Sequence, residues 1–399
     1  MKRKDINNIT ELNEFLGPEN LTFYYLKPFE FRDINFKFSL GNNFSELNGL
    51  IHSNSNGSTS TQFASIDYYI FDNCRFEEEL IISDNFDIQL TFKNKCQIYK
   101  VDFSEALIKK KIRFYECDFE DKCNFENTKF GELIDFWKST FHKPTVFLKT
   151  DFMKTSVFSA CIFYENVLFT YSLFNEKSIF RGAIFKKGLD LSLAIDSGEY
   201  NFFNISLNNF KSLKFSNEDE YNDMIYDGFI PTINKKETFR IIKQHFQNIG
   251  DDLEYVKYLK LEKKPIYQII TQNFVKNNPF QFWNYIHHLF DLLSLSLNRI
   301  SNNHRNSYLL GIGFTIIFGI IFFSLSLLSL PDFNINFNPN NWEKTGLWKD
   351  YISFMNPTHD IKLFDNYYPT GWTYFWQTWG RIFVGYGIYQ TVQAFRKLK

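Results

Sequence analysis

Large apolar residues recur every eleven positions through the middle of the chain. The first column of these residues holds Phe103, Phe114, Phe125, Phe136, Phe147, Phe158, Phe169, Phe180, Leu191, Phe202 and Leu213. A second column lies five residues later and holds Ile108, Phe119, Phe130, Phe141, Phe152, Phe163, Phe174 and Phe185. The residues between the columns are mostly polar or charged, so the pattern predicts a repeat protein rather than an ordinary globular core.

Small residues accompany both columns, two positions before the large residue. Before the second column they are Ala106, Cys117, Thr128, Ser139, Thr150, Cys161, Ser172 and Ala183. Before the first column they include Cys123, Thr145, Ser156, Val167 and Ser178. Residues i and i−2 of an extended chain point to the same side. Each half-repeat therefore directs one small and one large side chain inward, which fills a narrow cross-section.

An amphipathic helix is the competing interpretation, because a period of eleven also fits three helical turns. Residues spaced five and six apart point to different sides of a helix, however, so the two columns would not share a face. Phe, Thr, Ser and Cys are also poor helix formers. The extended interpretation is therefore favoured.

The pattern resembles that of the pentapeptide-repeat family, whose units carry a small residue at i−2, Leu or Phe at i, and polar residues between. The resemblance covers residues 71–215 and begins at Phe71-Asp-Asn-Cys74-Arg-Phe76. It implies a β-solenoid, a right-handed β-helix with four short sides in each 22-residue coil. This chain departs from the family because its sides alternate between five and six residues.

The β-helix is expected to span 63–215, behind an N-terminal cap at 1–62 that holds degenerate coils around residues 29–36 and a polar loop at 53–61. Each core Phe is expected to stack on the Phe 22 residues further along. The expected core is Phe114, Phe119, Phe125, Phe130, Phe136, Phe141, Phe147, Phe152, Phe158, Phe163, Phe169, Phe174, Phe180 and Phe185. Stability should then be nearly a sum over neighbouring coils.

Helical patterns replace the repeat after Leu213. Residues 216–223 are polar and acidic and are expected to form a loop. Two helices follow, one at 237–249 that ends at Gly250 and one from Asp251 to about Lys263, before Pro265. A third, amphipathic pattern at 282–300 fits either a buried helix or a helix in the membrane interface. We therefore expect a helical hairpin and an interfacial helix at 216–304.

The last part of the chain, 305–399, predicts a two-span transmembrane module. Residues 307–330 carry no charge over 24 positions, which is long enough to cross a bilayer. A second apolar stretch at 374–395 contains one charge, Arg381. Trp372, Trp376 and Trp379 are expected to anchor its outer end in the membrane interface. The loop 331–371 would then lie outside.

Basic residues predict the orientation. Arg299 and Arg305 precede the first span, and the chain ends Arg396-Lys397-Leu398-Lys399, so the positive-inside rule places both termini and the β-helix in the cytoplasm of a bacterial cell, at the inner membrane. The charged start lacks a following apolar segment of the secretory type. Five cysteines without CxxC spacing indicate reduced thiols.

Composition narrows the function further. The chain has 49 Phe, which need a regular core in which to stack, and a net charge of −1. Some pentapeptide-repeat rods imitate DNA, but that mechanism needs an acidic face. Residues 101–213 hold 15 Lys/Arg and 15 Asp/Glu, so neither DNA mimicry nor nucleic-acid binding is expected.

No catalytic motif is evident. The seven His residues show no metal-ligand spacing, and His287-His288 is expected to be a pair on a helix surface. Serine-nucleophile, phosphate-loop and dinucleotide-binding motifs do not occur. We therefore expect no enzyme activity, no cofactor and no metal.

The segment Val384-Gly385-Tyr386-Gly387 spells the centre of a potassium-channel selectivity filter. Too few residues follow it to form the inner helix that such a filter requires. Gly380, Gly385 and Gly387 are instead expected to let membrane helices approach closely. Arg381 fits two interpretations, a position facing a pore or bundle interior and one that snorkels to the outer interface.

Two functional hypotheses follow. The C-terminal half resembles that of uncharacterised bacterial membrane proteins in which a helical hairpin and two spans follow pentapeptide repeats. In the first hypothesis, the chain is a homo-oligomeric, channel-like or membrane-perturbing effector, for which antiviral defence is one setting. In the second, the spans are an anchor, and the β-helix or hairpin is a scaffold for a protein partner. The lipid bilayer is a partner in both.

Overall fold

The computed structural model describes residues 3–15, 28–40, 68–196, 198–215, 218–276, 282–331, 346–358, 364 and 368–396. The predicted polar loop at 53–61 lies outside the described residues. The chain divides into two compact units, Met1–His245 and Phe246–Lys399. The division falls within helix α5 (Thr232–Asn248).

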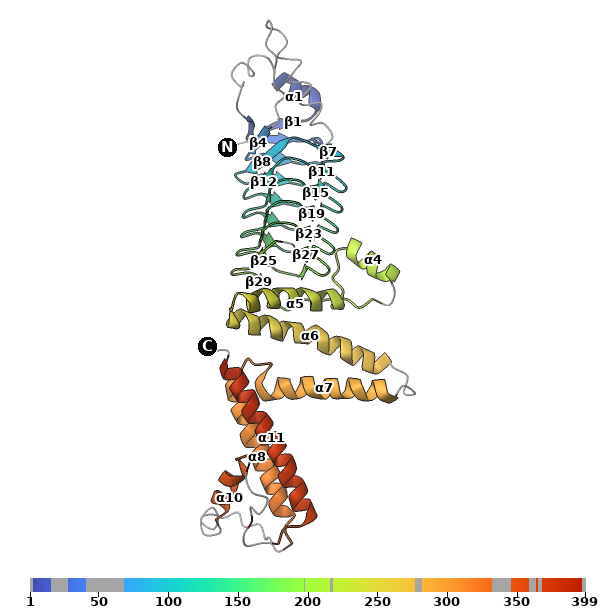
Figure 1. Ribbon diagram of the computed structural model, residues 1–399. Helices are drawn as coiled ribbons and strands as arrows, with labels where there is room; N and C mark the ends of the chain where they lie inside the picture. The colour runs from blue at the N-terminus through green and yellow to red at the C-terminus, as the bar shows by residue number, and fades with distance from the viewer. Residues whose placement is uncertain are drawn as a thin grey trace. The chain divides into compact units, whose positions relative to one another are not determined.

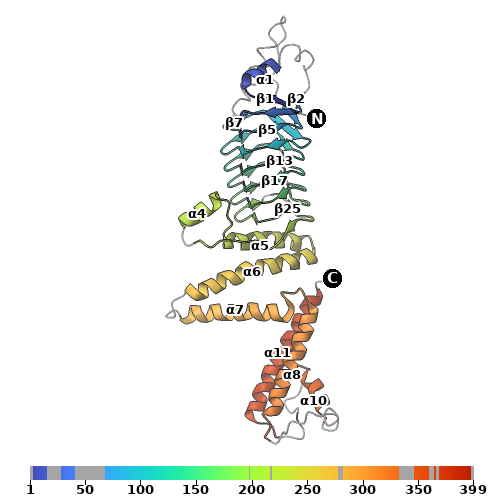
Figure 2. The ribbon, with the colours of Figure 1, turned by 180° about the vertical axis from the view of Figure 1, so that it is seen from behind.

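The first unit is a parallel β-solenoid, whose stacked coils are shown from two sides in Figures 1 and 2. Its four sheets contain nine, six, six and eight strands. Paired strands are offset by one coil, as in Phe119 opposite Phe141 and Ile112 opposite Ile134. The predicted 22-residue coil is therefore confirmed.

The strands of each sheet follow the coil sequence. The nine-stranded sheet contains β1 (Lys4–Ile6), β3 (Ile34–Phe36), β5 (Arg75–Phe76), β9 (Gln97–Ile98), β13 (Asp118–Phe119), β17 (Thr140–Phe141), β21 (Ile162–Phe163), β25 (Ile184–Phe185) and β29 (Ser206–Leu207). The eight-stranded sheet contains β2 (Phe29–Arg32), β4 (Tyr68–Asp72), β8 (Gln89–Lys93), β12 (Ile112–Phe114), β16 (Ile134–Asp135), β20 (Ser156–Val157), β24 (Ser178–Ile179) and β28 (Tyr200–Asn201).

The two six-stranded sheets close the coil. One contains β6 (Leu80–Ile81), β10 (Val101–Asp102), β14 (Cys123–Asn124), β18 (Thr145–Val146), β22 (Val167–Leu168) and β26 (Leu189–Asp190). The other contains β7 (Asn85–Phe86), β11 (Leu107–Ile108), β15 (Lys129–Phe130), β19 (Asp151–Phe152), β23 (Leu173–Phe174) and β27 (Ile195–Asp196).

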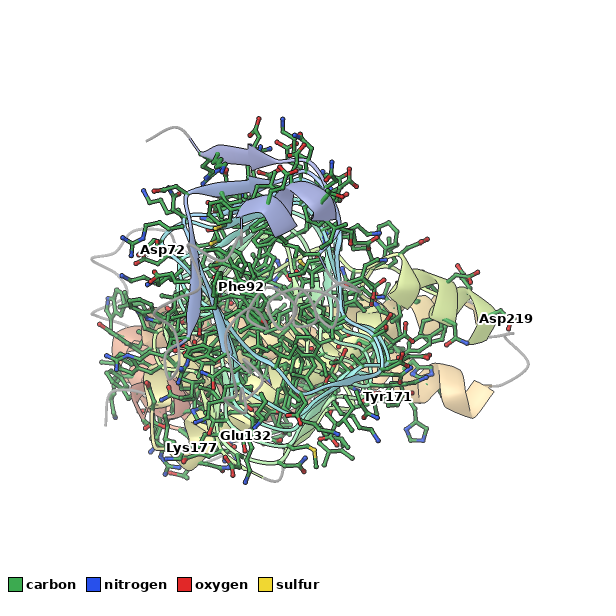
Figure 3. The ribbon with its side chains drawn as sticks, turned by 90° about the horizontal axis from the view of Figure 1, so that it is seen from above. Asp72, Phe92, Glu132, Tyr171, Lys177 and Asp219 are labelled. Atoms are coloured by element: carbon green, nitrogen blue, oxygen red, sulfur yellow. The ribbon has the colours of Figure 1, made fainter. Side chains whose placement is uncertain are left out.

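Phenylalanine ladders fill the interior of the solenoid. All fourteen predicted core Phe residues are buried, and Figure 3, a view along the coils, shows Phe92 near the middle and Glu132 and Lys177 at the edge. Phe136 stacks on Phe158 with ring centroids 5.6 Å apart, and Phe147 stacks on Phe169 at 4.6 Å. The expected stacking at one-coil spacing is thus confirmed, and offset or edge contacts between rings add to the burial energy.

The small inward residues also bond the coils together. The hydroxyl of Thr128 donates to the carbonyl of Phe103 at 2.7 Å, and Ser139 bonds Phe114 in the same way at 2.8 Å. Thr150, Cys161 and Ser172 repeat this contact in the following coils. Each inward polar group thereby avoids the cost of burial without a partner. All five cysteines are buried and free, and burial raises the pKa of the Cys161 thiol.

One corner of each half-coil is a hydrogen-bonded turn with a left-handed third residue, as in a type II turn. Positive φ recurs every eleven residues at Glu105, Glu116, Asn127, Lys138, Lys149, Ala160, Tyr171, Gly182, Leu193 and Asn204. In the first of these turns, the amide of Ala106 donates to the carbonyl of Phe103 at 3.1 Å. The other corner of each half-coil, which follows the second column of apolar residues, has one more residue. The spacing between inward apolar residues therefore alternates between five and six.

The start of the chain adds strands to the first coils. Strands β2 and β3, within residues 29–36, extend two of the sheets, and β1 pairs with β3. Helix α1 (Ile9–Phe15) follows β1. At the other end of the first unit, Leu213 forms an isolated bridge with Pro231, and α5 (Thr232–Asn248) follows.

The prediction of a polar loop at 216–223 was wrong, because α4 (Glu218–Tyr226) is a helix. Asp219 and Asp223 are exposed, while Tyr221 and Ile225 pack on Val146, Leu148 and Leu168 at the side of the solenoid. Burial of these two side chains offsets the poor hydropathy of the segment.

The second unit is helical. It contains the last turn of α5, α6 (Asp252–Lys276), α7 (Phe282–Asn302), α8 (Tyr308–Leu328), α10 (Leu347–Phe354) and α11 (Gly371–Phe395). The predicted end of α6 near Lys263 was wrong, since the helix continues through Pro265. A proline inside a helix removes one backbone hydrogen bond. The helix nevertheless continues to Lys276.

Candidate functional site

Helices α8 and α11 form an antiparallel pair in the second unit (Figures 1 and 2). Ser329, just after α8, donates to the Thr373 hydroxyl at 2.8 Å. Seven residues earlier on α8 and seven residues later on α11, Phe322 lies against Gly380. One further step of seven in the same directions places Thr315 against Gly387. The pairs follow a seven-residue repeat along both helices, which is the spacing of a coiled-coil seam.

Small residues make this seam close-packed. A β-carbon on Gly387 would collide with the Thr315 side chain of α8. One on Gly380 would lie 3.2 Å from Cβ of Phe322 of α8 and would also collide with Phe354 of α10. On the opposite helix, a β-carbon on Gly311 would lie 2.5 Å from Oγ1 of Thr391. Such contacts let membrane helices approach closely.

Of the three glycines predicted to pack, the structure therefore places Gly380 and Gly387 on the seam. Gly385 is not on it, since its nearest non-local neighbour would be Pro357 at an ordinary 3.6 Å. The segment Val384-Gly385-Tyr386-Gly387 lies inside α11. Its backbone carbonyls are engaged in a helix and do not line an ion path.

Arg381 lies one position beyond Gly380 and is half-buried, at the edge of the seam. Trp372 and Trp379 are exposed, at 66% and 41% of their surface. Trp376 is half-buried and packs against Phe322 with centroids 6.3 Å apart. The three tryptophans thus lie in the first turns of α11. The rings of Trp372 and Trp379 are exposed at the protein surface.

Buried polar residues lie on α11 and at the end of α7 that contacts it. Asn302, at the end of α7, donates to the Gln390 carbonyl of α11 at 3.1 Å and is fully buried. Gln377 is 2% exposed, and its amide has no hydrogen-bond partner among the described residues. A buried amide in that state is costly, which makes Gln377 an exceptional feature of the hairpin.

Sequence reasoning missed Gly311, Thr315, Gln377, Gln390 and Thr391 as members of this site. A signal for one side of the seam is present in the sequence, because Thr373, Gly380, Gly387 and Ala394 recur every seven residues and are all buried. The partner residues on α8 carry no such local signal, since Phe322 is large.

Helix α7 carries exposed apolar side chains along much of its length. Leu289, Phe290, Leu293 and Ile300 are 39% to 64% exposed. These exposed side chains do not fit the interpretation of a fully buried helix, and the interfacial interpretation stays a prediction.

A turn of three left-handed residues, Asn303, His304 and Arg305, joins α7 to α8. Partial burial and the nearby charges of Lys263, Arg299 and Lys260 lower the pKa of His304 to about 4. His304 is therefore neutral at physiological pH. The cations that surround it belong to α6 and α7.

Among the described residues, α8 is the one helix long and apolar enough to count as a candidate membrane span. Helix α11 is not, so the two-span module stays a prediction. No group of His, Cys, Asp and Glu that could hold a metal ion is present in the part of the chain that the structure describes.

Comparison with known proteins gives no assignment. The chain matches no protein-family model, no curated protein and no solved structure. The functional argument therefore depends on the geometry of the chain itself.

Proposed function

We propose that this chain is a membrane protein of the pentapeptide-repeat type, in which α8 and α11 cross the bilayer together and copies assemble into a conducting or membrane-perturbing pathway. The main support for this proposal is the apolar outer surface of the α8–α11 pair. Exposed apolar side chains cover α8, including Ile312, Ile316, Ile317, Ile320 and Ile321, and α11, including Ile382, Ile388 and Val392. An apolar surface of this kind is expected where helices contact the hydrocarbon core of a bilayer.

The modest hydropathy of α11 is consistent with this proposal. Its buried residues include Thr373, Gln377, Gly380 and Gln390, which face the seam or the end of α7. An average over the helix counts these polar residues against membrane insertion. In the paired state they are hidden from lipid, and inward-facing polar residues are the usual arrangement in membrane helices.

Assembly of several copies follows from the packing of the pair. Close contacts such as Gly387 against Thr315 leave no lumen along the seam, so a pathway would have to form between copies. Thr378, Arg381, Gly385 and Tyr389 recur at spacings of three or four residues on the flank and outer side of α11. A stripe of polar and small residues is poorly matched to lipid and suits a contact between copies or a wet path.

Basic residues near α8 support the proposed orientation of the chain in the membrane, with the β-helix on the cytoplasmic side. Lys260, Lys263, Arg299 and Arg305 lie before α8 and show no ion pair among the described residues. Basic residues beside a span remain in the cytoplasm and are attracted to anionic lipid headgroups. The β-helix would then lie on the cytoplasmic side of a bacterial inner membrane, where antiviral defence is one setting for such an effector.

A scaffold is the second candidate function. Trp137, Tyr164 and Phe203 are 40% to 63% exposed on the solenoid, and exposed aromatic side chains are favoured anchors at protein interfaces. In this hypothesis the helix pair is only an anchor.

Membrane potential distinguishes the two functions. We would compare bacterial cells that produce the full chain, the variant Arg381→Leu and a truncation that ends at Asn303, with membrane fractionation to show that each protein is present. Depolarisation by the full chain and not by the truncation is expected. Loss of depolarisation in Arg381→Leu would assign the arginine to the pathway, and its retention would assign an interfacial role.

An absence of depolarisation by full-length protein located in the membrane would contradict the conducting hypothesis and favour the scaffold. Oligomeric state in mild detergent is the complementary measurement, because a monomeric pair of helices cannot enclose a path.

A further inference from the structure

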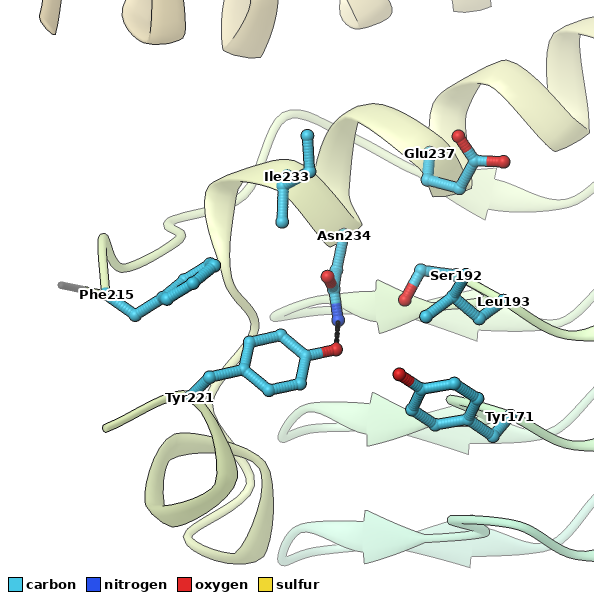
Figure 4. Close-up of a pocket in the computed structure, with 8 residues that line it drawn as sticks. All are labelled: Tyr171, Ser192, Leu193, Phe215, Tyr221, Ile233, Asn234 and Glu237. Atoms are coloured by element: carbon cyan, nitrogen blue, oxygen red, sulfur yellow. Dashed lines mark hydrogen bonds between the residues drawn. The ribbon is translucent and has the colours of Figure 1, made fainter. Parts of the chain in front are cut away.

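A cavity of about 420 Å³ lies within the first unit, at the side of the last coils (Figure 4). The solenoid supplies one wall, α4 and the segment before it supply another, and the first two turns of α5 close a third side. This volume lies in the range of small-molecule sites.

Corner residues of two adjacent coils form the solenoid wall. Tyr171 and Leu193 occupy equivalent left-handed corners one coil apart, and they are 44% and 51% exposed. Opposite them, Tyr221 of α4 turns its ring toward the cavity (Figure 4). The two tyrosine rings approach each other at their hydroxyl ends (Figure 4), so a flat ring can stack on a ring face but not between them, and such aromatic stacking is favourable.

One lining residue of the cavity has a buried hydroxyl without a hydrogen-bond partner. Ser192 is 2% exposed, and its hydroxyl has no hydrogen-bond partner among the described residues. Figure 4 shows this hydroxyl and that of Tyr171 turned toward the same space. A buried hydroxyl without a partner costs free energy that a ligand can recover.

Asn234 is held in place beside Ser192. Its Nδ2 donates to Oδ2 of Asp190 at 2.9 Å and to the Tyr221 hydroxyl at 3.2 Å. These bonds fix the orientation of the amide, and its carbonyl oxygen forms no bond with the described residues. Ser192 and Asn234 together offer a donor and acceptors for the edge of a heteroaromatic ring.

The electrostatics disfavour anions. Asp190 lies behind the cavity, where Thr170 and Asn234 donate to it, and burial raises its pKa. Glu237 lies at the rim and pairs with Arg240. No Lys or Arg is among the described residues that line the cavity. A phosphate or carboxylate would therefore enter without a counter-charge.

We propose that this cavity binds an uncharged, flat heteroaromatic molecule that packs against the rings of Tyr171 and Tyr221, with its edge bonded to Ser192 and Asn234. The proposal concerns the first unit alone. It does not depend on the proposed membrane function, and either can fail without the other.

The test uses the full chain in lipid nanodiscs, with adenosine and cytidine as uncharged probes and their 5′-monophosphates as anionic counterparts. Saturation-transfer NMR and titration report binding. We expect at least one nucleoside to bind with a Kd below about 10 mM, and its monophosphate to bind at least about tenfold more weakly. Tyr171→Ala should weaken nucleoside binding about tenfold, and Ser192→Ala about fivefold.

Tyr164→Ala is the matched control, because Tyr164 is a similarly exposed tyrosine, at 48%, outside the cavity lining. It should leave binding unchanged. Ile233→Trp, at an exposed lining position, should block the cavity if Tyr171→Ala proves unstable. The proposal is overturned if neither nucleoside binds, if the monophosphate binds as well as the nucleoside, or if folded cavity variants bind like the Tyr164→Ala control.

Discussion

Gly387 of α11 lies directly against Thr315 of α8, with no space for a β-carbon between them. The reciprocal arrangement occurs one turn away, where Gly311 of α8 lies against Thr391 of α11. Each helix thus presents a glycine to a threonine of the other. The threonine hydroxyls bond to backbone carbonyls of their own helices, Thr315 to Gly311 and Thr391 to Gly387, both at 2.8 Å.

The first prediction is that Gly387→Ala destabilises the helix pair by about 1–3 kcal/mol, because the added methyl group overpacks the seam. Gly385→Ala is the matched control two residues away. Its β-carbon meets only Pro357, at 3.6 Å, and should be tolerated. Denaturant unfolding in mild detergent micelles measures both. Equal stability of the two variants would contradict the seam.

The second prediction concerns the phenylalanine ladders. Phe158 is fully buried and stacks on Phe136 and Phe180, so Phe158→Ala should lower the free energy of unfolding of the solenoid by about 3–5 kcal/mol. Phe203→Ala removes a ring that is 63% exposed and should have little effect. Chemical denaturation compares the two variants, and a loss below 1 kcal/mol, roughly the cost of an ordinary substitution, would contradict a continuous core.

The third prediction concerns a corner. Gly182 has a φ of +67°, although a β-carbon there would meet only Cα of Ala160, at 4.0 Å. Gly182→Ala should therefore cost about 1 kcal/mol through backbone strain alone. The converse substitution, Ala160→Gly at the equivalent left-handed corner one coil earlier, should cost nothing or stabilise slightly. Thermal unfolding of both variants decides this, and a neutral Gly182→Ala would show that these corners are not strained.

The fourth prediction is a pH dependence in the second unit. The pKa of His304 is lowered from 6.5 to about 4, so the folded state binds fewer protons than the unfolded state between these values. The contribution of His304 to stability is complete above pH 6.5 and is lost as the pH falls toward 4. Because His304 is only half-buried, screening should keep the loss near 1 kcal/mol.

His304→Asn removes this titration and suits the left-handed backbone, which Asn tolerates. Thermal unfolding at pH 7 and pH 5 should show a greater loss of stability for the natural protein than for the variant. The same loss in both proteins would exclude His304 as the group responsible.

Much of the solenoid could be predicted from the sequence, because its contacts repeat at a fixed spacing. The partner of Phe136 in the ladder is one coil away along the chain, at Phe158, so a local pattern contains long-range information. Helix α4 could not be predicted in this way. Its stability comes from Tyr221 and Ile225 against Leu168 and its neighbours, and the acidic residues around them suggest a loop.

The candidate site was predicted only in part. Glycines in an apolar segment indicate close packing but not which of them face the partner, since Gly385 and Gly387 differ by two residues and lie on different sides of α11. Arg381 was identified by its charge. Gln377 was missed, because an uncharged amide in an apolar helix is conspicuous only when its surroundings are known.

The repeating bond between an inward hydroxyl or thiol and a carbonyl of the previous coil has a consequence for how such a chain can change in length. Ser139 and Cys161 make the same contact one coil apart, to Phe114 and Phe136. Deleting residues 140–161 would join two equivalent points, so every new junction would resemble one already present. Gene duplication or loss in units of 22 codons could therefore lengthen or shorten the solenoid in steps of about 4.8 Å per coil, while its two ends keep their own structures.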